Sequence, residues 1–159
     1  MRILLAIDGS PTSNAAVDEV CRRPWPPASE VRLITVRCPI ELLRLRENLG
    51  QPVSGDDIFQ QSGWDSLKFL DDAAMQLAQC APDLQVTPVI LEGQPKEVIL
   101  DEAENWGADL IIVGSRGHGA VRRFLLGSVS FAVALNAPCS VEIVRRPFEL
   151  LTEGATVPK

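Results

Sequence analysis

The stretch ADLIIVGSRGHGAVRRFLLGSVS spans residues 108–130 and is the most informative part of the chain. Its apolar run 110–113 predicts a fully buried strand, because the run is short and bounded by turn residues. Gly114, Gly117 and Gly127 follow, and helical spacing of apolar residues resumes from Ser128. A buried strand that passes through glycines into a helix is a common phosphate site in α/β proteins. Glycines allow backbone amides to approach an anion closely, and the helix N-terminus offers unpaired N–H groups.

The charge distribution also favours an anionic ligand. Residues 110–141 contain Arg116, Arg122 and Arg123 but no acidic residue, although the whole chain has a net charge of −6. A local reversal of this kind favours an anion, whereas the acidic balance of the chain argues against general nucleic-acid binding. Each of the three arginines is equally well explained as a phosphate contact or as a solvated loop side chain.

The spacing of the glycines identifies the motif. The P-loop pattern GxxxxGK[ST] is absent, and Gly114, Gly117 and Gly119 run as GxxGxG rather than GxGxxG. Gly114, two residues, Gly117, nine residues and Gly127-Ser128 together resemble the nucleotide-binding motif of the universal stress protein family. The opening strand ILLAIDGS at 3–10 and the pair EG at 92–93 before Pro95 are also similar to that family. The resemblance covers residues 1–146.

This resemblance implies a site for ATP, with Mg²⁺ only as a counter-ion of the triphosphate. Three groups of residues are expected to form the site. The triphosphate would lie against Gly114, Gly117, Gly127 and Ser128, with further contacts from Arg116 and the amide of Val129. The ribose would bind Asp8, and the adenine pocket would be lined by Ala6, Val36 and Val113, with Ile7 beside them.

Asp8 has an independent physical reason to lie at the site. In an open parallel sheet, ligands bind outside the carboxyl ends of the strands, where the strand order reverses. Asp8 follows the first predicted strand at that edge, and its carboxylate can accept hydrogen bonds from hydroxyl groups. The alternative is that Asp8 only caps the turn that it opens.

The remaining patterns alternate between strands and helices. Strands are predicted at 2–8, 31–36, 84–91, 110–113 and 140–144, and helices at 12–23, 66–79, 95–106 and 128–135. This order predicts a single doubly wound, five-stranded parallel sheet with helices on both faces, a Rossmann-like α/β fold. The family resemblance implies that the fold is of the adenine nucleotide alpha hydrolase-like type. Residues 1–146 are expected to form one domain and residues 147–159 a C-terminal tail. The segment 37–66 is a variable excursion, for which the pattern favours solvated chain over the alternatives of a lid on the ligand or a partner surface.

Composition sets the expected location. No apolar run approaches the ~20 residues of a membrane span, so no membrane partner is predicted. Cys21, Cys38, Cys80 and Cys139 form no CxxC pair, and His118 is the single histidine, so no metal site is predicted. We therefore expect four unpaired thiols in a reducing cytoplasm.

No nucleophile with a base, and no other catalytic residue, is evident. The sequence thus predicts a stress or regulatory protein in which bound ATP biases conformation or assembly, with little or no turnover. The alternatives are a slow ATPase or phosphotransferase, and a nucleotide-independent dimeric scaffold. The resemblance also implies a homodimer through strand 140–145, although a charge at Glu142 on an edge strand argues against pairing.

Overall fold

The computed structural model describes residues 1–38, 55–117 and 126–145, and of residues 55–66 it describes the backbone alone. Its centre is a parallel sheet with the strand order β3-β2-β1-β4-β5. The strands are β1 (Arg2–Ala6), β2 (Glu30–Arg37), β3 (Gln85–Glu92), β4 (Leu110–Gly114) and β5 (Ser140–Val144). The order reverses between β1 and β4, so the doubly wound prediction is confirmed.

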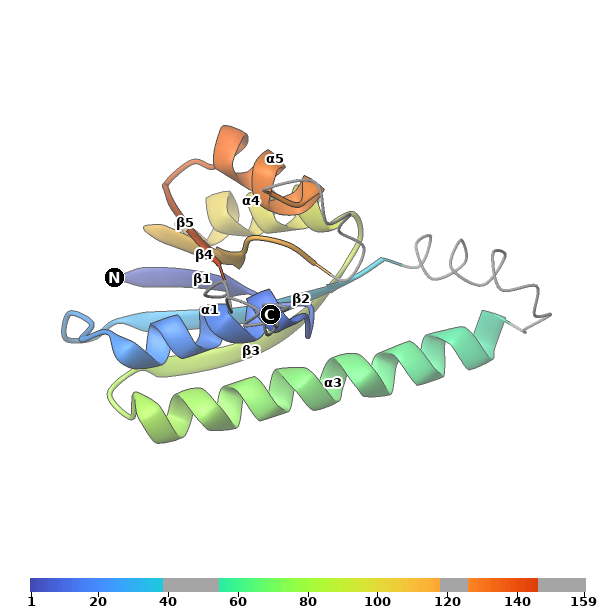
Figure 1. The fold of residues 1–159 in the computed structure, drawn as a ribbon, viewed down its shortest axis with the longest axis horizontal. Helices are drawn as coiled ribbons and strands as arrows, with labels where there is room; N and C mark the ends of the chain where they lie inside the picture. The colour runs from blue at the N-terminus through green and yellow to red at the C-terminus, as the bar shows by residue number, and fades with distance from the viewer. Residues whose placement is uncertain (39–54, 118–125, 146–159) are drawn as a thin grey trace, which may run out of the picture.

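Helices cover both faces of the sheet (Figure 1). On one face lie α1 (Pro11–Arg22) and α3 (Gly55–Cys80), and on the other lie α4 (Pro95–Trp106) and α5 (Ser128–Asn136). Ser10 is the N-cap of α1, because its side chain accepts a hydrogen bond from Ser13 N–H, and Pro11 occupies the first turn. The left-handed Gly107, with φ 69°, ends α4. None of the helices in the described part of the chain has the length and apolar character needed to cross a bilayer.

The core has two halves, one on each face of the sheet. Alternate residues of β1 point in opposite directions, so that Ile3 and Leu5 pack beneath α1 and α3, whereas Leu4 packs beneath α4 and α5. Because both faces are covered, the inner strands are continuous apolar runs rather than alternating ones. This is why the run 110–113 could be recognised as a buried strand.

The prediction of a helix over 66–79 is too short. The helix α3 begins at Gly55, so its first turns occupy part of the segment 37–66 that we expected to be a variable excursion. Once a helix has formed, each added residue gains one backbone hydrogen bond, so extension costs less than nucleation. The residues from Leu67 onward have the periodic apolar pattern from which the helix can extend toward Gly55. Residues 39–54 lie outside the described part of the chain, so the lid and partner-surface interpretations stay predictions.

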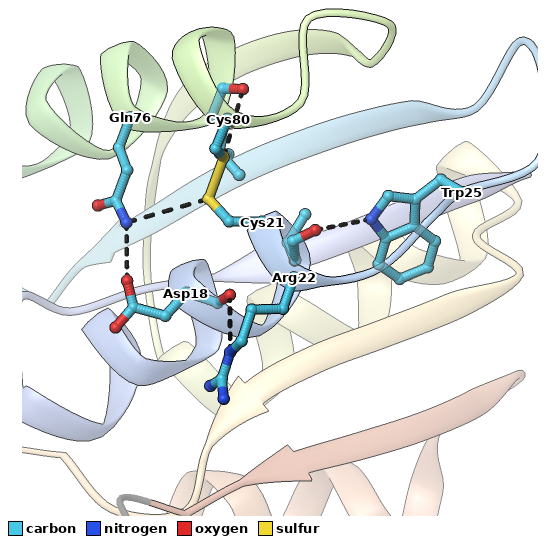
Figure 2. The surroundings of a disulfide bond; sticks show 8 residues. Asp18, Cys21, Arg22, Trp25, Gln76 and Cys80 are labelled. Carbon is cyan, nitrogen blue, oxygen red and sulfur yellow. Dashed lines mark hydrogen bonds between the residues drawn. A yellow bond between two sulfur atoms is a disulfide. The ribbon is translucent and has the colours of Figure 1, made fainter.

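The prediction of four unpaired thiols is also wrong. Cys21, in the last turn of α1, and Cys80, at the end of α3, form a disulfide with a Cα–Cα distance of 5.4 Å (Figure 2). Cys38 and Cys139 carry free thiols. The two bonded cysteines are 59 residues apart in sequence, and only the packing of α3 on α1 brings them together.

The two outer strands differ in character. In β3, Pro88 pairs in register with Leu33 and removes one backbone N–H from the strand. In β5, Glu142 accepts two hydrogen bonds from the Arg23 guanidinium, at 2.7 and 2.6 Å. The charge predicted to oppose pairing of this edge is therefore compensated within the chain.

Candidate functional site

The candidate site lies at the carboxyl ends of β1 and β4, where the strand order reverses. The last residue of β1, Ala6, pairs with Val113 of β4, and the chain then continues through Ile7 and Asp8 into α1. The Ile7 amide donates to the Ile34 carbonyl at 2.9 Å, which extends the pairing with β2 by one residue. Asp8 is exposed at this edge. The predicted position of the site is the one expected for ligands of doubly wound sheets.

The turn after β1 is organised by Asp8. One carboxylate oxygen, Oδ1, accepts a hydrogen bond from the Ser10 amide at 3.0 Å, and Gly9 between them has a φ of 77°. Asp8 therefore does cap the turn that it opens, as the alternative interpretation held. A carboxylate has several acceptor positions, so this bond leaves the group chemically able to accept from a hydroxyl as well.

Two hydroxyl groups join this turn to the loop after β4. The Arg116 carbonyl accepts hydrogen bonds from Ser10 Oγ at 3.2 Å and from Thr12 Oγ1, and the Arg116 amide donates to Thr12 Oγ1 at 3.3 Å. Ser10 and Thr12 were not among the predicted site residues. Their contacts with Arg116 depend on the proximity of β4, and the short polar run SPTS soon after a buried strand was the available signal.

The first two glycines of the motif each admit a close neighbour. A Cβ atom on Gly114 would lie 2.7 Å from Ser13 N and from Thr12 C, so Gly114 lets the first turn of α1 approach β4. A Cβ atom on Gly117 would lie 2.5 Å from Asp8 Oδ2, so Gly117 leaves room for that carboxylate. Gly114 thus has a packing reason that the phosphate interpretation alone did not predict.

The third glycine begins α5. Gly127 is the N-cap of this helix, none of the side chains in the described part of the chain caps it, and the first turn contains no acidic residue. The Gly127 amide donates to the Ser115 carbonyl at 2.8 Å, and Ser130 Oγ donates to the same carbonyl at 2.9 Å. Ser128 is exposed directly beside this junction. First-turn amides have no acceptor within their own helix, so this end of α5 can bind an anion.

An apolar surface, in which Val113 is buried and the other residues are half-buried, accompanies these polar groups. Ala6, Val36, Val113 and Val129 all belong to the hydrophobic cluster on the α4 and α5 face of the sheet. Ile7 does not join them, because its side chain is buried in the cluster on the α1 and α3 face. The structure therefore brings together most of the predicted apolar residues and separates the Ile7 side chain from them.

The predicted basic residues are only partly described. The Arg116 side chain is exposed beside Gly117, whereas Arg122, Arg123 and His118 lie outside the described residues. The site thus combines a carboxylate, a helix N-terminus with a serine hydroxyl, and an apolar wall. The carboxylate can accept hydrogen bonds from hydroxyl groups of a ligand, and the helix N-terminus can bind an anionic group. The apolar wall can pack against a flat apolar ring of the same ligand.

A groove of about 730 Å³ lies along α1 rather than at this edge, and it runs from Gly9 to Arg22 with Cys21 in its lining. Only its Gly9 end approaches the carboxyl edge of the sheet. The chemistry of the edge, not the volume of this groove, identifies the candidate site.

Known proteins resemble the chain over most of its length. The model of the universal stress protein family matches residues 1–145. The universal stress protein YxiE of Bacillus subtilis is 31% identical over 147 residues, which cover 91% of this chain and 98% of that protein. The solved structure of the protein MJ0577, described as a structure-based assignment of biochemical function, has a TM-score of 0.78 and 27% identity over 91% of this chain and 95% of that one. A universal stress protein family protein of Arabidopsis thaliana with AMP bound has a TM-score of 0.63 and 18% identity over 94% of each chain, which shows the shared fold.

Proposed function

The chain belongs to the universal stress protein family, and from that premise we propose that it binds ATP at the carboxyl ends of β1 and β4. The observation that carries the proposal is the combination of Gly117 beside Asp8 with the N-terminus of α5 at Gly127, which no described side chain caps. The first allows the Asp8 carboxylate to lie at the exposed edge of the sheet, and the second offers backbone amides to an anion. A family protein with AMP bound shares the fold, which is consistent with an adenine nucleotide as the ligand.

Each part of the nucleotide has a matching group in this proposal. Asp8 accepts hydrogen bonds from the ribose hydroxyls, and Ser128 with the Val129 amide donates to the phosphates. Ala6, Val36 and Val113 form the apolar side of the adenine pocket, where Ile7 contributes main-chain atoms only because its side chain faces the other core. Mg²⁺ accompanies the triphosphate as its counter-ion, and ATP itself biases the conformation or assembly of a stress or regulatory protein.

The nucleotide test uses the protein as purified. Protein denatured directly after purification should release an adenine nucleotide, and the nucleotide-free protein should bind ATP in a calorimetric titration. Gly127→Arg places a long side chain at the N-terminus of α5 and should abolish both results. Ala134→Arg adds the same charge at an exposed position near the other end of α5 and should preserve them.

The titration has a clear adverse outcome. Wild-type protein that neither carries nucleotide nor binds ATP would refute the proposal and favour the nucleotide-independent scaffold. ADP produced at a rate that falls with Gly127→Arg would instead identify the slow ATPase.

We also propose a homodimer through strand 140–145. β5 is an outer strand, its Val141 and Ile143 are half-buried, and the Glu142 carboxylate is compensated by Arg23. Light scattering at micromolar concentration should give twice the mass of one chain. Val141→Pro should return a single-chain mass, because proline removes a backbone donor from the edge. A wild-type protein with the mass of one chain would contradict the homodimer. We propose the cytoplasm as the location of this dimer.

A further inference from the structure

The Cys21–Cys80 disulfide has the accessibility of an exchangeable bond. Cys80 is exposed at the end of α3, and Cys21 is half-buried but lines the groove along α1. A small thiol or disulfide can therefore reach the bond from solvent. Exposed disulfides are the labile and regulatory ones, whereas shielded structural disulfides resist reduction.

The packing of α3 on α1 does not depend on the disulfide. Leu70, Ala73 and Leu77 of α3 are buried in one hydrophobic cluster with Val17 and Val20 of α1. A hydrogen bond of 2.7 Å from Gln76 Nε2 to Asp18 Oδ1 also joins the two helices, one turn before the disulfide (Figure 2). These contacts remain when the sulfur–sulfur bond opens, so both the oxidised and the reduced chain are expected to be folded.

The same two helices approach the candidate site away from the disulfide, α1 at its first turn and α3 at Phe69 near its middle. Ser10 and Thr12, at the start of α1, donate hydrogen bonds to the Arg116 carbonyl. The ring of Phe69, in α3, packs close to Gly9, since a Cβ atom on Gly9 would lie 3.1 Å from this ring. Gly9 directly follows Asp8. The disulfide therefore restrains two helices that both contact the turn carrying this carboxylate.

We propose that Cys21 and Cys80 form a reversible redox clasp, which exchanges with a glutathione-type disulfide and whose oxidised form favours nucleotide binding. The coupling to the nucleotide rests on the proposed function, whereas the exchange itself does not. Closing the bond fixes the end of α3 to the last turn of α1, and so limits the movement of both helices relative to the turn at Asp8. A chain already restrained loses less freedom when a ligand orders the turn at Asp8, so its affinity is higher.

The exchange is balanced in thiols and disulfides. The exposed Cys80 thiolate attacks one sulfur of glutathione disulfide, which breaks that S–S bond and releases one glutathione thiolate. The Cys21 thiolate then attacks the Cys80 sulfur of the mixed disulfide and releases the second glutathione. Two protein thiols and one glutathione disulfide thus give one protein disulfide and two glutathione thiols, and the reverse sequence opens the clasp.

The first experiment measures the exchange without any nucleotide. The full chain is equilibrated in buffers with increasing ratios of reduced to oxidised glutathione, quenched with acid, alkylated after denaturation and weighed by mass spectrometry. We expect the Cys21–Cys80 pair to convert from disulfide to two alkylated thiols over this series, with an unchanged circular dichroism spectrum. A disulfide that survives excess reduced glutathione in the folded protein, or one that does not form in oxidised glutathione, would overturn the clasp.

The second experiment measures the coupling. The oxidised protein should bind ATP about fivefold more tightly than the reduced protein, at the lower end of ordinary coupling between sites. Cys80→Ser should bind like the reduced protein under both conditions, and Cys139→Ser should keep the difference because that thiol lies outside the pair. Equal affinities for the two wild-type forms would overturn the coupling alone. An absence of ATP binding in both forms, with the exchange intact, would overturn the proposed function and the coupling with it.

Discussion

Replacing Gly114 by alanine should destabilise the fold, because this glycine admits the first turn of α1. The added Cβ would lie 2.7 Å from Ser13 N, Thr12 C and Thr12 Oγ1. Carbon contacts are normally about 3.5–4.0 Å, so α1 must retreat by about 1 Å at this end. Overpacking of this kind costs about 1–3 kcal/mol, and weakening of the bonds between Thr12 and Arg116 adds about 1 kcal/mol.

The expected loss is therefore about 2–4 kcal/mol in the free energy of unfolding. For a domain of this length, about 2–4 °C of melting temperature corresponds to each kcal/mol, so we expect a decrease of about 5–15 °C. The measurement is thermal unfolding by circular dichroism on nucleotide-free protein with Cys21–Cys80 fully oxidised. Both conditions must be fixed, because bound ligand and the cross-link each raise the melting temperature.

Gly127→Ala is the matched control within the same motif. Its nearest neighbour to an added Cβ is Arg116 Cα at 3.3 Å, and its φ of −74° suits any residue. We expect a loss below about 1 kcal/mol, which reflects the weaker capping by alanine. Melting temperatures that fall equally in the two variants, or a Gly114→Ala protein as stable as the wild type, would refute the close approach of α1 to β4.

Three further predictions concern other parts of the structure. Ser10→Ala removes the N-cap hydrogen bond from Ser13 N–H and the hydrogen bond to the Arg116 carbonyl, so urea unfolding should show a free energy of unfolding lower by about 1–2 kcal/mol. An unchanged urea midpoint would contradict these two hydrogen bonds. A double-mutant cycle of Arg23→Ala with Glu142→Ala should give a coupling energy of about 0.5–1 kcal/mol, since the ion pair is bidentate but partly exposed. If the two substitutions change the free energy of unfolding additively, the pair contributes nothing to stability. Burial, followed by the Asp109 carboxylate, raises the pKa of the Cys139 thiol, so less thiolate is present at a given pH and alkylation of Cys139 by iodoacetamide should be slow. Asp109→Asn should accelerate this alkylation. An unchanged rate would contradict the electrostatic cause.

The fold was predictable because each inner strand carries its own signal. The run 110–113 is apolar throughout and is followed by glycines, and α1 has Ser10 and Pro11 at its start. The first turns of α3 were missed because Gly55 and Gly63 weaken the helical pattern there, and a propagated helix tolerates residues that a predicted helix does not. Local patterns determine where elements lie more reliably than where they end.

The candidate site was predictable in position but not in all of its contacts. Asp8 and Gly117 were both identified, yet their mutual approach depends on the pairing of β1 with β4 and leaves no trace in sequence spacing. The Cys21–Cys80 disulfide was missed for the same reason, because 59 residues separate its halves. Ile7 stays a predicted site residue through its main chain, because its side chain continues the alternation of Ile3 and Leu5 into the core on the α1 and α3 face.

Pro88 in β3 limits how copies of this chain can associate through their sheets. A sheet with two usable edges can add copies at both ends and grow into an open filament. Here β3 lacks a backbone donor at its middle, whereas β5 carries none of these interruptions and has its acidic side chain bound by Arg23. Strand addition at β5 alone stops at a dimer. Two copies that pair through the same edge are related by a twofold axis, so both β5 edges are used. The edges that remain outside are the two β3 strands, each of which carries Pro88.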